Sequence, residues 1–282
     1  MTATAVRQPA QAGRFYPGSA KELRKTVEEL IAKAKAPGEA ARPIGLVSPH
    51  AGYIFSGATA AHAYQTLAGK GIERVVVLAP SHYAHCPGAS IFDGRAYRMP
   101  MGEIPLDQDL IALLRADRPD LFIFEPEADE EEHSLEVQLP FLQAVLGEGW
   151  KLTPVIISKQ SWGNCREIGE ALGRAIAKSG AAEKTVVVAS SDLYHGSSYK
   201  ECKKSDQKIA EAVERFEPER LVAGNERGEF MACGAGPIAA TMVASRALGA
   251  TRARVLAQTN SYDAHPVNDS YIVGYLAAVF VE

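Results

Sequence analysis

The sequence has few cysteines and no long apolar run. Its four cysteines are too few and too scattered for a disulfide framework, and none forms the CxxC pair typical of a structural zinc site. They are Cys86, Cys165, Cys202 and Cys233. No stretch approaches the roughly 18 apolar residues needed to cross a bilayer, and the N-terminus lacks the apolar core of a signal peptide. We therefore expect a cytoplasmic protein that has no membrane partner.

An excess of basic residues is also missing. The 30 lysines and arginines are outnumbered by 34 acidic residues, which gives a formal net charge of -4 and a pI near 6.0. No basic run of the nucleic-acid-binding type occurs, so we expect no nucleic acid as a partner. Neither a GxGxxG fingerprint after a strand nor a GxxxxGK[ST] motif is present, which argues against dinucleotide or phosphate binding.

Apolar residues are, in contrast, abundant and periodic. They make up 46% of a chain long enough to bury a large core, and we expect one domain over residues 1–282. Short, nearly continuous apolar runs predict buried strands over residues 44–47, 75–79, 152–158 and 185–190. Helical spacing is found over residues 56–69, 106–116, 134–146, 165–179 and 203–216. This alternation predicts an α/β protein, a three-layer α/β/α sandwich with a central mixed sheet.

The C-terminal part continues this pattern, and one acidic segment interrupts it. A helix is expected from Pro237 to residue 248, followed by strands over residues 252–259 and 271–281 that could form a sheet edge. The acidic run at residues 125–132 is the sharpest change in composition, and we expect it to be a solvated loop, with the start of a helix near Ser134 as the alternative.

Polar turns that contain histidine follow three of the predicted strands. Their sequences are LVSPHAGY, VLAPSHYAH and ASSDLYHGSSY. Because the carboxyl ends of the strands of an α/β sheet converge on one crevice, His50, His82 and the pair Asp192 and His195 could meet there. Two neutral imidazoles and one anionic ligand would form a metal site with three protein ligands and open coordination positions. The sequences of the turns do not show which residue supplies the anionic ligand.

Simpler interpretations exist for each of these residues. A buried imidazole is more often a hydrogen-bonded core residue than a ligand. Cys233 lies between two small residues, where a cysteine is usually a small buried hydrophobe. His85 follows His82 in a loop and is expected to face solvent.

Five phrases together resemble a known family. SPHAGYIFSG, APSHY, EEHSLEVQLPFL, SSDLYH and ACGAGPI occur in this order and resemble the Memo family, also called AmmeMemoRadiSam system protein B. The resemblance extends from Gly13 to the C-terminal strand. That family is similar in fold to the class III extradiol ring-opening dioxygenases, which hold non-haem iron(II) by two histidines and a carboxylate. The resemblance therefore implies a metal pocket.

The resemblance also implies roles for single residues. His50 and His82 match the two histidine ligands, and Cys233 matches the third pocket residue. A thiolate in place of the carboxylate shifts the preference of the site toward copper(I), zinc or thiolate-ligated iron, and iron(II) is the cofactor we expect first. Asp192 and His195 match the other pocket positions and are the expected catalytic residues, with His195 where the dioxygenases place an acid/base group.

By the same resemblance, one further segment approaches the pocket. It comprises Glu132, His133, Ser134, Glu136 and Gln138. Of these, His133 and Glu136 are expected to surround the metal ligands.

Several functions are compatible with these residues. The first is a metal-dependent oxidoreductase, and the second is a non-catalytic protein that binds a small molecule or a phosphotyrosine peptide. The family's system name implies a third, a pathway component beside a radical SAM enzyme and an AMMECR-type protein. Without a metal, Cys233 could form a thiolate–imidazolium pair with His50 or His82. A hydrolytic zinc site is less favoured because HExxH is absent.

Overall fold

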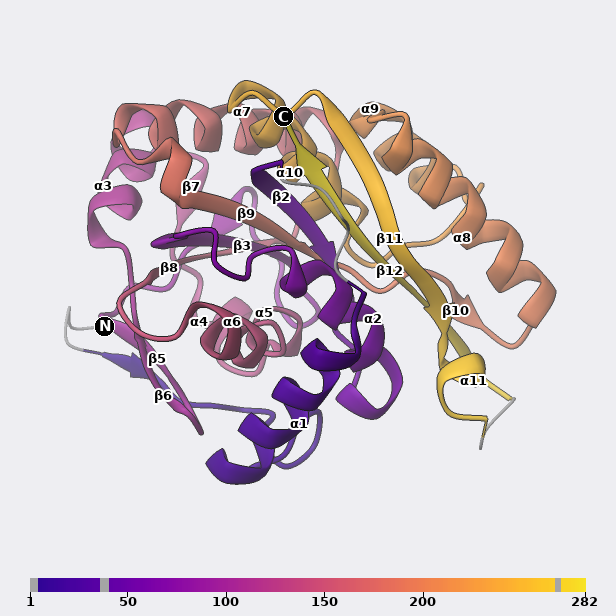
Figure 1. Ribbon diagram of the computed structural model, residues 1–282. Coiled ribbons are helices and arrows are strands. Elements are labelled where there is room, and N and C mark those ends of the chain that lie inside the picture. The colour runs from indigo at the N-terminus through magenta and orange to yellow at the C-terminus, as the bar shows by residue number, and fades with distance from the viewer. Residues whose placement is uncertain (1–4, 36–40, 267–269) are drawn as a thin grey trace.

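A mixed sheet lies at the centre of the protein (Figure 1). The computed structural model describes residues 5–35, 41–266 and 270–282, and nine strands of this part form the sheet. Its order is β10 (His195–Gly196), β12 (Ile272–Val281), β2 (Pro43–Ser48), β9 (Thr185–Ser190), β3 (Arg74–Pro80), β8 (Lys151–Ile157), β4 (Ala89–Ser90) and β7 (Phe122–Ile123), with β11 (Arg252–Asn260) paired to β12.

The middle of this sheet is parallel. Strands β2, β9, β3 and β8 run in one direction and are buried almost throughout, as their continuous apolar sequences predict. Strand β12 pairs antiparallel to β2, and β11 lies outside β12. The prediction of an edge is therefore confirmed for β11, whereas β12 lies inside the sheet.

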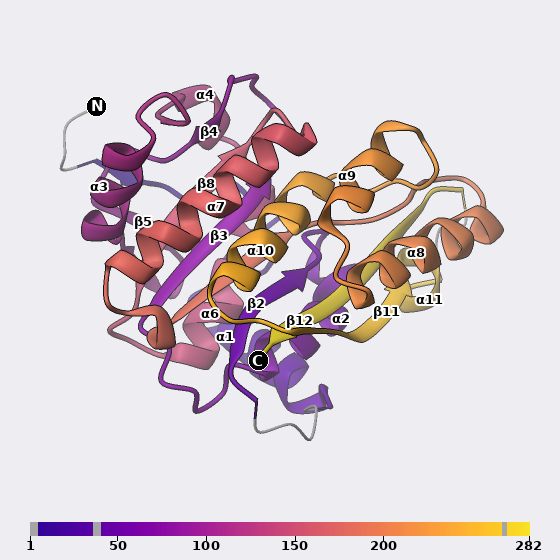
Figure 2. The ribbon, with the colours of Figure 1, turned by 90° about the horizontal axis from the view of Figure 1, so that it is seen from above.

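Helices cover both faces of the sheet. One layer contains α1 (Ala20–Lys33), α2 (Tyr53–Gln65), α5 (His133–Glu136) and α6 (Leu139–Leu146). The other contains α3 (Gln108–Asp117), α7 (Trp162–Lys178), α8 (Tyr199–Glu214), α9 (Pro218–Glu226) and α10 (Ala235–Ala247). Figure 2 shows α7, α10, α9 and α8 across one face, with α1, α2 and α6 behind the sheet. This arrangement is the predicted three-layer sandwich.

Other elements differ from the expected ones. The helix predicted over residues 134–146 is divided into α5 and α6, because Pro140 in the first turn of α6 has no N–H to continue a helix from α5. A small sheet of β1 (Val6–Arg7), β5 (Ala96–Met99) and β6 (Gly102–Pro105) was not expected.

Short helical turns complete the description. They are α4 (Pro126–Asp129), α11 (Ser261–Ala264) and the 3₁₀ turn η1 (Ala182–Lys184). Residues 267–269 of the turn-rich segment before β12 lie outside the described residues. In the described part of the chain, no helix is both long and apolar enough to span a membrane.

The acidic run at residues 125–132 is not simply a solvated loop. Glu127, Glu130 and Glu131 are exposed, but Asp129 and Glu132 are buried. The carboxylate of Asp129 accepts hydrogen bonds from the hydroxyls of Tyr97 and Ser90. The prediction was wrong for these two residues because their partners are far away in the sequence.

Candidate metal centre

The centre lies at the carboxyl ends of three adjacent parallel strands. β9 is flanked by β2 and β3, so the turns that follow these strands meet at one edge of the sheet. His50 lies two residues after β2, His82 two residues after β3, and Asp192 two residues after β9. Cys233 precedes α10, and its backbone N–H donates to the Asp192 carbonyl oxygen, which places it at the same edge. The predicted convergence is therefore confirmed.

Three of these side chains form a compact donor set. The ligand atoms of His50, His82 and Cys233 lie within 4.8 Å of one another, and His50 Nε2 is 3.2 Å from Cys233 Sγ. The His50 and His82 rings are nearly perpendicular, with centroids 5.5 Å apart. His50 is buried, whereas 32% of the His82 side chain is exposed, so the donor set is open to solvent on one side.

A serine hydroxyl determines which nitrogen of His50 is free. Ser190 Oγ lies 2.6 Å from the Ser134 carbonyl oxygen, which can only accept, so the Ser190 hydroxyl donates there. Ser190 Oγ also accepts a hydrogen bond from Gln138 Nε2 at 2.8 Å and lies 2.8 Å from His50 Nδ1. His50 Nδ1 therefore carries a proton, and Nε2 presents its lone pair toward Cys233.

A buried carboxylate determines which nitrogen of His82 is free. Glu132 Oε1 lies 2.9 Å from His82 Nδ1, and Oε2 accepts the His82 backbone N–H at 2.6 Å. Burial raises the pKa of Glu132, but hydrogen bonds from His82 and Ser134 outweigh it and lower the pKa to about 2. The ionised carboxylate accepts the Nδ1 proton, which leaves His82 Nε2 free for a metal.

His50 and Cys233 are both uncharged at neutral pH. Burial, and then the charge of a protonated His82, lower the pKa of His50 to about 3. Burial and the nearby Asp192 carboxylate raise the pKa of the Cys233 thiol well above its usual value. A neutral imidazole therefore faces a neutral thiol, which disfavours a resting thiolate–imidazolium pair.

Asp192 joins the two sides of the donor set. Its Oδ1 accepts the backbone N–H groups of His50 at 2.7 Å and Ala51 at 3.3 Å. Its own backbone N–H donates to Cys233 Sγ at 3.2 Å, and its carbonyl oxygen accepts from that thiol at 3.3 Å. Burial raises the pKa of the Asp192 carboxyl. The structure thus places Asp192 where it holds both His50 and Cys233.

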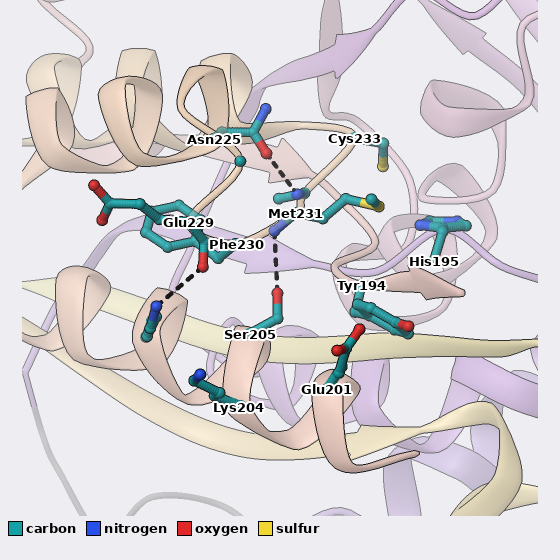
Figure 3. Close-up of a pocket in the computed structure, with 13 residues that line it drawn as sticks. Tyr194, His195, Glu201, Lys204, Ser205, Asn225, Glu229, Phe230, Met231 and Cys233 are labelled. Carbon is teal, nitrogen blue, oxygen red and sulfur yellow. Dashed lines mark hydrogen bonds between the residues drawn. The ribbon is translucent and has the colours of Figure 1, made fainter. Parts of the chain in front are cut away.

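His195 lies beside the centre with one nitrogen available. Its Nδ1 is 2.9 Å from the Leu193 carbonyl oxygen, which can only accept, so Nδ1 carries a proton. Nε2 of the neutral ring can therefore accept one. His195 and Cys233 line the same cavity, which has a volume of about 600 Å³ (Figure 3).

The segment that contains α5 contributes to the centre differently from what was expected. His133 lies as predicted, with its ring centroid 4.4 Å from that of His82 and 5.3 Å from that of His50. Glu136 does not surround the ligands. Its carboxylate instead binds Arg7, the Tyr16 hydroxyl and backbone N–H groups of the N-terminal segment.

Comparison with known sequences identifies the family. The sequence model described as "Memo-like protein" matches residues 7–279. The chain belongs to the Memo family. A MEMO1 family protein of Methanopyrus kandleri is 36% identical over 97% of this chain and 98% of its own length. Those of Aeropyrum pernix and Aquifex aeolicus are 35% and 33% identical, over 96% and 98% of this chain and 98% and 99% of their own lengths.

In this Memo-family protein, the sequence and the resemblance predicted the three candidate metal ligands but not the residues that orient the two histidines. The sequence identifies Ser190 only as the last residue of a strand, and the resemblance identifies Gln138 only as a residue near the pocket. The resemblance also places Glu132 near the pocket, next to His133, without a role. The position of Glu132 at the end of an acidic run predicts exposure to solvent, whereas the structure buries it.

Proposed function

We propose that this Memo-family protein is a metal-dependent oxidoreductase whose centre binds iron or copper through His50, His82 and Cys233. The observation that supports this most is the donor geometry, since three ligand atoms lie within 4.8 Å of one another. Hydrogen bonds fix the Nδ1 protons of both histidines, so the Nε2 atoms are available without rearrangement.

The donor set fits such a metal. Imidazole nitrogen and thiolate sulfur suit iron, copper and zinc, while hard cations such as magnesium prefer oxygen ligands. Three protein donors leave a coordination position free, and the exposed side of His82 gives access to it. Iron or copper in this centre would supply electron transfer with an oxidisable substrate, whereas zinc would supply only Lewis acidity.

Two further residues have roles in this proposal. His195 accepts a proton at Nε2 from a ligand in the adjoining cavity and returns it later, since its Nδ1 proton is held by Leu193. Asp192 keeps His50 and Cys233 in position through its carboxylate and its backbone.

A second candidate function is ligand binding without turnover. The cavity beside Cys233 and His195 has the volume typical of a small-molecule site. In this alternative, a small molecule or a peptide side chain occupies the cavity and the metal has only a structural role.

Metal analysis of anaerobically purified protein tests the proposal. Wild type should retain close to one equivalent of iron or copper, while His82→Ala and Cys233→Ser should lose it. His85→Ala is the matched control, because His85 is exposed and its Nδ1 lies 3.3 Å from Ser158 Oγ, which is not a residue of the donor set. Retention of the metal by His82→Ala would refute the centre. Metal binding without oxygen or substrate consumption would favour the second candidate.

A further inference from the structure

The loop before α10 has a fixed backbone. The N–H of Met231 donates to Ser205 Oγ at 3.0 Å, and the N–H of Ala232 donates to Asn225 Oδ1 at 2.8 Å. The N–H of Cys233 donates to the Asp192 carbonyl oxygen at 3.2 Å. Helices α8 and α9 and the turn after β9 therefore hold three successive residues of this loop.

The side chain of Met231 is exposed, although a hydrogen bond fixes its backbone. It is 45% exposed, whereas Met99 and Met242 are buried in the core and Met101 is partly buried. A single exposed apolar side chain is ordinary, so its place beside Cys233 in one cavity matters more than its exposure. Methionine has three rotatable bonds and a polarisable sulfur, so it can adapt to a ligand.

Met231 belongs to the same cavity as Cys233 of the centre and the neighbouring His195. Met231, Cys233 and His195 all line the cavity of about 600 Å³. Figure 3 shows the Met231 side chain extending from the loop in the direction of Cys233 and His195, with its sulfur at that end. Thioether, thiol and imidazole thus face one space.

Charge does not define the ligand of this cavity. Two carboxylates, Glu201 and Glu229, and two ammonium groups, Lys204 and Lys208, also line it. Opposite charges in equal number give no net attraction for an anion or a hard cation. The sulfur atoms of Met231 and Cys233 are therefore its distinguishing chemistry.

We propose that Met231 is an additional sulfur ligand that makes this centre selective for a soft monovalent cation of the copper(I) class. The inference rests on the proposed metal centre and extends it by one donor. The Met231 thioether would hold a copper(I) ion together with His50, His82 and the Cys233 thiolate, whose proton would go to solvent. Thiolate and thioether sulfur together favour copper(I), because copper(I) is a softer cation than iron(II) or zinc.

Copper(I) binding to metal-free protein tests this role. Cu(I), kept reduced with ascorbate under anaerobic conditions, is titrated against the chelator bicinchoninate for wild type, Met231→Leu and Met101→Leu. Met231→Leu should weaken Cu(I) binding about tenfold, the lower end of what loss of a supporting metal contact costs. Iron(II) and zinc affinities should not change. Met101→Leu removes a thioether far from the centre and should behave as wild type.

X-ray absorption supplies a readout that a structural role would not alter. Copper in wild type should have two sulfur neighbours, and copper in Met231→Leu should have one. One sulfur neighbour and equal Cu(I) affinity in both proteins would overturn the inference.

The variants also separate this inference from the metal centre itself. If Met231→Leu matches wild type while Cys233→Ser and His82→Ala lose copper, only the role of Met231 fails. If all three variants keep wild-type affinity, the proposed centre fails as well.

Discussion

Oε1 of Glu132 lies 2.9 Å from Nδ1 of His82, and Oε2 of the same carboxylate accepts the His82 backbone N–H at 2.6 Å. One buried side chain therefore fixes both the position of the loop and the orientation of the imidazole. Ser134 adds its own N–H and hydroxyl to Oε1, so the carboxylate itself is held rigidly. Carboxylate–histidine–metal arrangements of this kind raise the basicity of the ligating nitrogen.

Replacement of this carboxylate should weaken metal binding. Glu132→Gln removes the negative charge that accepts the His82 Nδ1 proton, and we expect a loss of about 10- to 100-fold in zinc affinity, measured by competition with a chromogenic chelator. Glu131→Gln is the control, because its side chain is exposed. Equal affinity in Glu132→Gln and wild type would show that His82 needs no such support.

Metal affinity should rise with pH because of Cys233. Burial raises the pKa of its thiol, so the sulfur is protonated at neutral pH and a metal must displace that proton. His50 contributes no proton, since its lowered pKa of about 3 keeps it neutral. Calorimetry in buffers of different ionisation enthalpy should therefore show about one proton released by wild type for each metal ion bound. Metal binding by wild type without proton release would contradict the assignment of Cys233 as a ligand.

The glycine after Cys233 should tolerate no side chain. A Cβ at Gly234 would lie 2.4 Å from the Ser190 carbonyl oxygen and 2.7 Å from Ser191 Cβ, so the backbone of the centre would have to move. We expect Gly234→Ala to lower the melting temperature and to reduce the metal content. Gly163→Ala, in α7, has no atom within 4 Å of the added Cβ and should do neither. A Gly234→Ala protein with full metal content would refute the close packing.

The ion pair between Arg7 and Glu136 should contribute to stability rather than to metal binding. Both side chains are almost fully buried, with 5% and 0% exposure, and Tyr16 donates to the same carboxylate. Glu136→Gln leaves the guanidinium without its counter-charge, so the free energy of unfolding in urea should fall by about 3–5 kcal/mol. Glu73→Gln, which breaks an exposed pair with Lys184, should leave the urea midpoint unchanged. Loss of stoichiometric metal in folded Glu136→Gln would contradict this separation.

Local sequence patterns predicted the buried strands and the histidine-containing turns that follow them. The buried strands have continuous apolar sequences, and parallel strands bring the turns that follow them to one edge of the sheet. The sequence therefore predicts that His50 and His82 lie close together. Cys233 precedes a helix and follows no strand, and only the family resemblance identified it. The prediction of solvent exposure is wrong for Glu132, because its burial depends on a contact with His82, fifty positions earlier. Local composition contains no information about such a contact.

The order β2, β9, β3 has a consequence for the time at which the centre can form. His50 is oriented by Ser190 on β9, and the third donor arrives only with the start of α10, more than 180 positions after the first. A growing chain that exposes His50 and His82 therefore has neither the hydrogen bond that orients His50 nor the sulfur that completes the donor set. Loops of this length close late in folding. For the proposed metal centre, the complete donor set therefore exists only in the nearly finished protein.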